Sequence, residues 1–207
     1  MSRTDPLLQI AISYEENIPE EIISHFVSKV VTPGLDVKTE VREPSLQANL
    51  EWLIPTAVII FIGKAYFDSF LKEMGKDHYH LLKKGILSLW KYFFGHDRTI
   101  NYKRVYTGGK ISSARQYSLA LSLMTDIFGE YRIKYLFKDD LSATDFEKAI
   151  TEFLNFLEEL DAGILKLEIR QQLENYRAVG RMVLLTYEDG QLKVLNPLPS
   201  QKAEDGT

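Results

Sequence analysis

The chain has no cysteine, no long apolar run and no excess of basic residues. Without cysteine there is no disulfide framework, no thiolate metal site and no cysteine nucleophile, which fits a reducing compartment. The most apolar stretch, residues 53–62, contains a proline and is half the length of a membrane-spanning helix, which needs about 20 residues. The net charge of −4 argues against general nucleic-acid binding. We therefore expect a cytoplasmic protein that is not embedded in a membrane.

Familiar catalytic motifs are also missing. The sequence has no H-E-x-x-H pair, no glycine-rich phosphate loop of the P-loop or G-x-G-x-x-G type, and no G-x-S-x-G turn. Two of its four histidines form the cluster Asp77-His78-Tyr79-His80. Helical residues two apart point away from each other, so His78 and His80 cannot share one ion. We predict no metal site and no cofactor, and we interpret this cluster as the surface of a helix start.

What the sequence does contain is an ordinary globular composition, 45% hydrophobic and 26% charged over 207 residues. A chain of this length buries enough surface to form a core without covalent or metal links. We predict an α/β core domain over residues 1–162, a helix and hairpin appendage over residues 163–199, and a disordered tail over residues 200–207.

The first half alternates between strand and helix signals. Short runs of aliphatic and β-branched residues predict strands at residues 7–13, 35–41 and 56–62. Segments with helical periodicity or helix-start residues fall between and after them, at residues 19–30, 45–52, 65–74 and 77–94. This order predicts a three-layer α/β fold, in which a parallel core of three strands is covered by helices on both faces.

The second half begins with strands of a different kind. Residues 117–124 and 131–137 alternate with a period of two, which predicts two long antiparallel strands. A helix over residues 117–128 is the competing interpretation, because leucine and alanine favour helices.

The C-terminal part contains the clearest helix signal of the chain. Ser142, followed three residues later by Asp145, predicts a capped helix start, and the apolar stripe of residues 146–160 predicts core packing. A further helix is expected over residues 167–178. Strands on either side of Asp189-Gly190 predict a hairpin, since this dipeptide favours a tight turn.

A candidate ligand site follows from the predicted parallel sheet. Ligands of such sheets bind beyond the carboxyl ends of the strands. Ser13 and Tyr14 end the first predicted strand, and Lys64 and Tyr66 follow the third. We therefore predict that these four residues line one cleft.

A second candidate is a segment in which basic and aromatic residues alternate around two glycines, residues 102–117. Stacking rings and cations could hold a nucleotide or a nucleic acid through its basic residues Lys103, Arg104, Lys110 and Arg115. A charged edge strand with an exposed loop would give the same pattern.

Two parts of the sequence resemble a known family. Ile12-Ser13-Tyr14 resembles the opening motif of Toll/interleukin-receptor-like (TIR-like) domains, and residues 56–69 are similar to the central strand and following helix of that family. The resemblance covers residues 7–74. It implies a flavodoxin-like sheet, with a role either in self-association for signalling or in NAD hydrolysis. In the hydrolytic members a glutamate of that helix is catalytic, which implies this role for Glu73.

The catalytic motif departs from the family pattern, because Ser69 rather than an aromatic residue stands one helical turn before Glu73. The leading hypothesis is therefore a non-enzymatic protein-interaction or signalling module that binds a protein partner or self-associates. NAD hydrolysis through Glu73 is the first alternative. Nucleotide or nucleic-acid binding through residues 102–117 is the second.

Overall fold

The computed structural model describes residues 8–44, 55–71, 76–96, 98–100, 117–127, 131–164, 167–174, 176 and 181–195. Their helices and strands follow one another in this order: β1 (Ile10–Glu15), α1 (Glu20–Val30), β2 (Val37–Arg42), β3 (Val58–Ile62), the π-helix η2 (Tyr66–Leu71), α3 (Lys76–Ser88), α4 (Trp90–Phe93), β4 (Tyr117–Ile127), β5 (Tyr131–Lys138), α5 (Ala143–Asp161), α6 (Leu167–Glu174), β6 (Met182–Glu188) and β7 (Gln191–Leu195).

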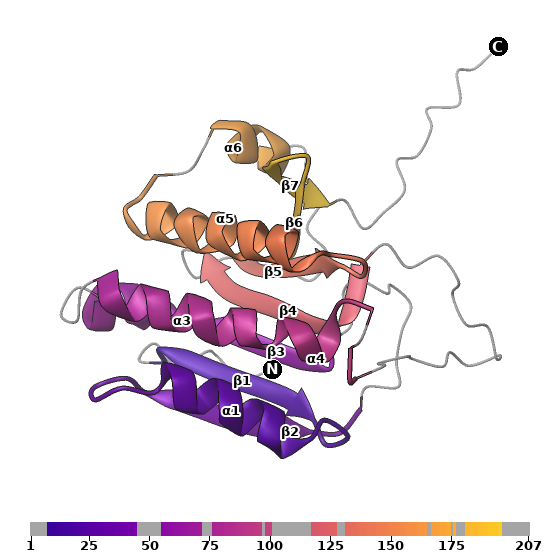
Figure 1. Cartoon of the computed structure of the whole chain (residues 1–207). Coiled ribbons are helices and arrows are strands. Elements are labelled where there is room, and N and C mark those ends of the chain that lie inside the picture. Colours follow the sequence, from indigo (N-terminus) through magenta and orange to yellow (C-terminus); the bar gives the residue numbers. More distant parts are fainter. Residues whose placement is uncertain are drawn as a thin grey trace, which may run out of the picture.

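The strands form one seven-stranded mixed sheet in the order β2-β1-β3-β4-β5-β6-β7 (Figure 1). Three neighbouring pairs are parallel: β1 with β2, β3 with β4, and β5 with β6. The junctions between these pairs, β1 with β3 and β4 with β5, are antiparallel, as is the final hairpin of β6 and β7. The strand direction therefore reverses from one parallel pair to the next.

The prediction of a parallel three-stranded core is wrong for β3. β1 and β2 are parallel, but β3 runs antiparallel to β1, with Ile10 opposite Ile62. The reason lies at the end of β2, where the Arg42 guanidinium donates hydrogen bonds to the backbone carbonyls of Thr56 and Ala57. β3 thus starts at the end of the sheet where β2 stops, and it runs back. The helix predicted over residues 45–52 lies outside the described residues.

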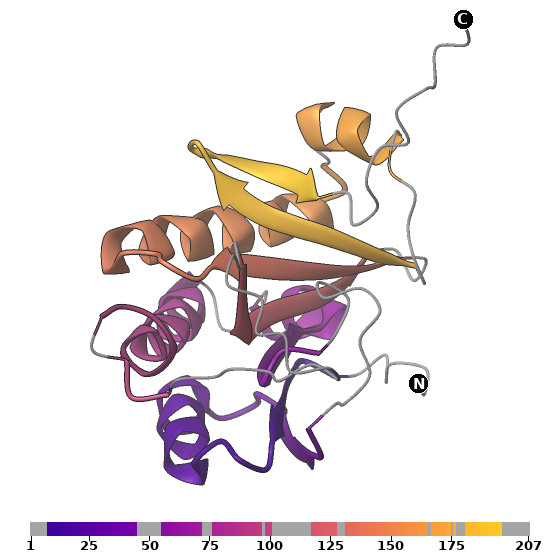
Figure 2. The same ribbon diagram turned by 90° about the vertical axis from the view of Figure 1, so that its right-hand side faces the viewer.

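Helices α1, α3 and α5 lie side by side on the same face of the sheet (Figures 1 and 2). They are not divided between the two faces, as the predicted three-layer arrangement requires. The main core fills the space between this helix layer and the sheet. Ile10 and Ile12 of β1 are fully buried in that core, whereas the alternate residues Ala11 and Ser13 are only partly buried.

The antiparallel pair of the second half is confirmed. Residues 117–127 form strand β4 rather than a helix, and β4 pairs antiparallel with β5. The hairpin is confirmed as well, with Asp189 and Gly190 at φ values of 52° and 80°, the left-handed region that its tight turn requires. Because β6 also pairs with β5, this hairpin continues the main sheet.

The predicted start and packing of α5 are confirmed. The Ser142 hydroxyl accepts a hydrogen bond from the backbone N–H of Asp145 at 3.1 Å. The apolar stripe of the helix is buried against β5, where the rings of Phe153 and Tyr135 stack with centroids 4.4 Å apart. Over the residues described, no helix is both long and apolar enough to cross a bilayer.

Candidate functional site

The four residues predicted to line one cleft are separated by the sheet. Ser13 and Tyr14 lie at the carboxyl end of β1, where Tyr14 is opposite Val58, the first residue of β3. Lys64 and Tyr66 follow the last residue of β3, at the other end of the sheet. The predicted cleft depended on β1 and β3 being parallel. Since they are antiparallel, the two pairs of residues cannot meet around one ligand.

Tyr66 and His78 belong to a buried hydrogen-bonded chain. The Tyr66 hydroxyl lies 3.0 Å from His78 Nδ1, and His78 Nε2 lies 2.7 Å from the carbonyl oxygen of Val30. A carbonyl only accepts, so Nε2 carries the proton and Nδ1 accepts from the tyrosine. The prediction that His78 lies on the surface is wrong, since only 2% of it is exposed. Burial lowers the pKa of His78, which keeps the ring neutral.

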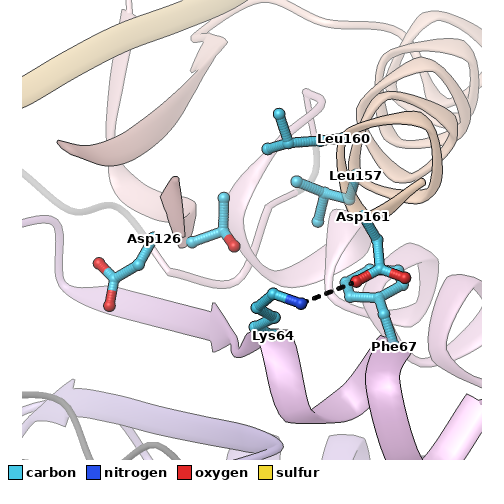
Figure 3. A pocket seen from close by; sticks show the side chains of 7 residues that line it. Lys64, Phe67, Asp126, Leu157, Leu160 and Asp161 are labelled. Carbon is cyan, nitrogen blue, oxygen red and sulfur yellow. Dashed lines mark ion pairs between the residues drawn. The ribbon is translucent and has the colours of Figure 1, made fainter. Parts of the chain in front are cut away.

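A small pocket lies at the carboxyl ends of β3 and β4, against the last turns of α5 (Figure 3). Lys64 and Asp161 point toward each other there, with Nζ 3.6 Å from Oδ1, and Lys64 also contacts Asp68. The hydrogen bond from Lys64 to Asp68 is the main cause that raises the pKa of this lysine. The cavity volume is about 30 Å³, far below the roughly 300–1,000 Å³ that is common for ligand pockets. This pocket is therefore too small for a substrate.

Several predicted site residues lie outside the described residues: Glu73, Lys103, Arg104, Lys110 and Arg115. Among the residues that the structure does describe, no group of three or more histidine, aspartate or glutamate side chains could hold a metal ion.

A buried ion pair occupies the carboxyl ends of β1 and β2. Glu15 is fully buried, and its Oε1 accepts a hydrogen bond from Arg42 Nη1 at 3.2 Å. The same guanidinium reaches the backbone of Thr56 and Ala57 at the start of β3. A buried carboxylate needs such a partner, so the pair holds three strand ends together. Its role is structural.

A larger groove runs along the edge of the sheet, between α1 and β2. Its volume is about 390 Å³, within the range of roughly 300–1,000 Å³ that is common for ligand pockets. Tyr14, one of the predicted ligand-binding residues, contributes to its wall, as do the following residues: Glu20, Ile23, Ser24, Val27, Ser28, Val31 and Thr39. Val31 in this wall is 51% exposed, and Val41 of β2 is 57% exposed.

The backbone of β2 has one side toward β1 and one side outward. The carbonyl of Asp36 accepts from Ile10 N–H, and that of Arg42 accepts from Glu16 N–H. Backbone groups alternate in direction along a strand, so those of Val37, Thr39 and Val41 point to the outer edge. No described strand pairs with that edge.

The side chains of β2 divide between the two faces of the sheet. Val37, Thr39 and Val41 pair in register with the buried residues Ile10, Ile12 and Tyr14, so they face the helix layer. Lys38 and Glu40 point to the opposite face and are exposed.

The groove was not predicted from the sequence, because β2 was assigned to a parallel sheet but not to the edge of that sheet. One signal was available. Its middle residues, Lys38 to Val41, lack the consecutive large apolar residues of a strand buried on both faces, and charged residues are common on edge strands. Comparisons with protein-family models, with curated proteins and with solved structures gave no match.

Proposed function

We propose that the protein is a protein-interaction module that binds its partner along the outer edge of β2 and in the groove between β2 and α1. One observation carries this proposal: a groove of about 390 Å³ lies directly beside a strand whose outward backbone groups have no strand partner among the described residues. An added strand would accept and donate hydrogen bonds along that edge, and its alternate side chains would enter the groove. Strand addition is a recurrent mode of protein recognition.

The groove also has the mixed character of a protein-binding surface. Ile23, Val27 and Val31 supply an apolar floor from α1 and its end, while Glu20 and two serines supply a polar rim. Apolar contacts at the centre with polar groups around them are the usual composition of interfaces between proteins.

The two alternatives gain no support from the described residues. For NAD hydrolysis, Tyr14 and Lys64 would have to contact one nucleotide, yet they lie at opposite ends of the sheet. The cavity beside Lys64 has a volume of only about 30 Å³. For nucleotide or nucleic-acid binding, the basic residues of the segment 102–117 lie outside the described residues.

Site-specific cross-linking tests the interaction proposal. A light-activated cross-linking amino acid is placed at Ser28, which lines the groove, and in a matched variant at Lys84, an exposed residue of α3. Irradiation of native cells should give protein adducts from position 28 and not from position 84. Ser24→Arg, which fills the groove, should remove those adducts. Equal adducts from both positions, or adducts that survive Ser24→Arg, would contradict the proposal.

A further inference from the structure

The residues of β2 on the two sides of Thr39 are complementary to each other. Val37 and Val41 stand two positions to either side of it, and Lys38 and Glu40, of opposite charge, stand one position to either side. Such a sequence is complementary to itself when it is read in the opposite direction. An antiparallel pair of identical strands does this, because a two-fold axis relates the two copies.

An axis at Thr39 gives favourable pairs on both sides of the centre of the strand. With the axis at Thr39, Lys38 lies opposite Glu40 of the second copy, and Val37 lies opposite Val41. An axis at Lys38 or at Glu40 would place like charges directly opposite each other, which is destabilising. The charges on this edge therefore reject a shift by one residue. An axis at Val37 or Val41 would leave most of β2 unpaired, whereas the axis at Thr39 pairs the strand from Val37 to Val41.

The backbone of β2 fits the same register. The groups that point outward belong to Val37, Thr39 and Val41, because those of the intervening residues face β1. When Thr39 lies opposite its own copy, each outward N–H faces an outward carbonyl of the second strand. This is the hydrogen-bonded arrangement of an antiparallel pair.

The helix layer provides an independent argument. Each parallel strand pair has one of the helices α1, α3 and α5 beside it, and these helices pack in a row (Figure 1). Two strand spacings amount to roughly 10 Å, close to the distance between packed helices. Across a β2–β2 junction, α1 of the second copy would be the next helix in the row. It would lie against Ile23, Val27 and Val31, which form the apolar floor of the groove.

Such a junction would also repeat a pattern within the chain. The parallel pairs already meet at antiparallel junctions, β1 with β3 and β4 with β5. An antiparallel contact between two β2 strands would be a further junction of this kind.

The geometry points to a symmetric dimer in which two copies of the chain join their β2 strands edge to edge, antiparallel and centred on Thr39. This inference rests on the proposed function and names the partner: a second copy of the same chain. The sheets of the two copies become one continuous sheet, and their helix layers meet along α1.

Single cysteines test the register, since the chain has none of its own. Thr39→Cys places the new thiol opposite its own copy, at a backbone separation of about 5.5 Å, which a disulfide can span. Mild oxidation should convert this variant to covalent dimer. Lys38→Cys is the matched control and should remain largely monomeric, because its opposite residue is Glu40. Equal cross-linking of both variants would overturn the register.

Charge reversal tests the pairing itself, with sedimentation equilibrium as the measurement. Lys38→Glu or Glu40→Lys should raise the dimer dissociation constant about tenfold or more, because residues 38 and 40 of the two copies then carry like charges on both sides of Thr39. The double variant with both changes restores opposite charges and should return the constant to near the wild-type value. Circular dichroism checks that each variant is folded.

The outcomes separate this inference from the proposed function. The β2–β2 dimer is overturned if the wild-type protein is monomeric at every accessible concentration. It is also overturned if the charge reversals leave the dimer dissociation constant unchanged. The proposed function would survive that result if cross-linking from Ser28 still yielded adducts with a different protein. If Ser28 and Lys84 gave equal adducts, the proposed function would fail independently of any dimer.

Discussion

His78 connects three helical elements through two hydrogen bonds. It lies in α3, accepts from Tyr66 in η2 through Nδ1, and donates from Nε2 to the Val30 carbonyl at the end of α1. A protonated ring would have a donor at both nitrogens, so Nδ1 would donate to the Tyr66 hydroxyl instead of accepting from it, and the positive charge would be buried. The burial of His78 therefore favours the neutral ring.

We therefore expect His78 to make the stability of the protein depend on pH. Its folded pKa is lowered by burial, whereas the unfolded ring keeps the ordinary value of 6.5. The unfolded state binds more protons between these two values, so stability is lost as the pH falls below 6.5 toward the folded pKa. Urea unfolding at about pH 7.5 and about pH 5.5 measures this loss.

His78→Gln should show a smaller loss of stability between the two pH values than the wild type. The exposed neighbour His80 provides the matched control, and His80→Gln should keep the wild-type loss. If the His78 variant retained the full wild-type difference, a proton on this ring could not be its cause.

The partners of buried polar residues were not predictable from the sequence. Glu15 and Arg42 are 27 positions apart, and they meet only because β1 and β2 are adjacent, parallel and in register. His78 was assigned to a surface because its helix position was known but the neighbouring α1 and η2 were not. In each case the contact depends on packing between elements, which local residue patterns do not encode.

At the scale of elements, α1 and α3 approach closely at a glycine. A Cβ atom at Gly85 of α3 would lie 2.5 Å from Val30 Cγ2 and 3.2 Å from a ring carbon of Phe26, both on α1. Side chains of α1 therefore occupy the space that any other residue at this position would need.

Gly85→Ala should destabilise the protein by about 1–3 kcal/mol, the usual range for overpacking a core. The sign is informative, because alanine stabilises an unconstrained helix by about 1 kcal/mol relative to glycine. Chemical denaturation measures the change. Lys84→Ala, at the exposed neighbouring position, should be close to neutral. A stabilised Gly85 variant would show that the two helices can separate at little cost.

The elements themselves were largely predictable, whereas their directions were not. The alternation in residues 117–124 and 131–137, the capped start of α5 and the Asp189-Gly190 turn are local signals, and the structure confirms each. The direction of β3 depends on where its chain enters the sheet. At that entry, Arg42 donates hydrogen bonds to the carbonyls of Thr56 and Ala57, across the intervening end of β1.

At the scale of the whole molecule, the predicted ligand site does not form because β3 runs antiparallel to β1. Ser13 and Tyr14 were assigned to the correct end of β1, and Lys64 and Tyr66 to the correct end of β3. These four residues could line one cleft only if the carboxyl ends of β1 and β3 lay at the same end of the sheet. The edge groove could be recognised only after the sheet order was known, because the charged residues of β2 indicate an edge strand but not the helix that lies beside it.

This arrangement leads us to expect no hydrolysis of NAD. The residues predicted to hold the nucleotide are divided between the two ends of the sheet. Incubation of concentrated protein with NAD should release no nicotinamide above the level of a buffer control, and Glu73→Gln should behave identically. Release that is abolished by Glu73→Gln would contradict this expectation and restore the enzyme hypothesis.

The sheet order has a consequence for how the chain acquires its structure. Every strand contact except that of β1 with β3 joins strands that are consecutive in the sequence. Two of these contacts join strands with short connections, β4 with β5 and β6 with β7, and such local pairings form faster than pairings between distant segments. The sheet can therefore grow strand by strand toward β7 as a ribosome releases the chain. β2, at the opposite edge, is among the first strands to emerge, and its outer side is never covered by a later strand of the described sheet.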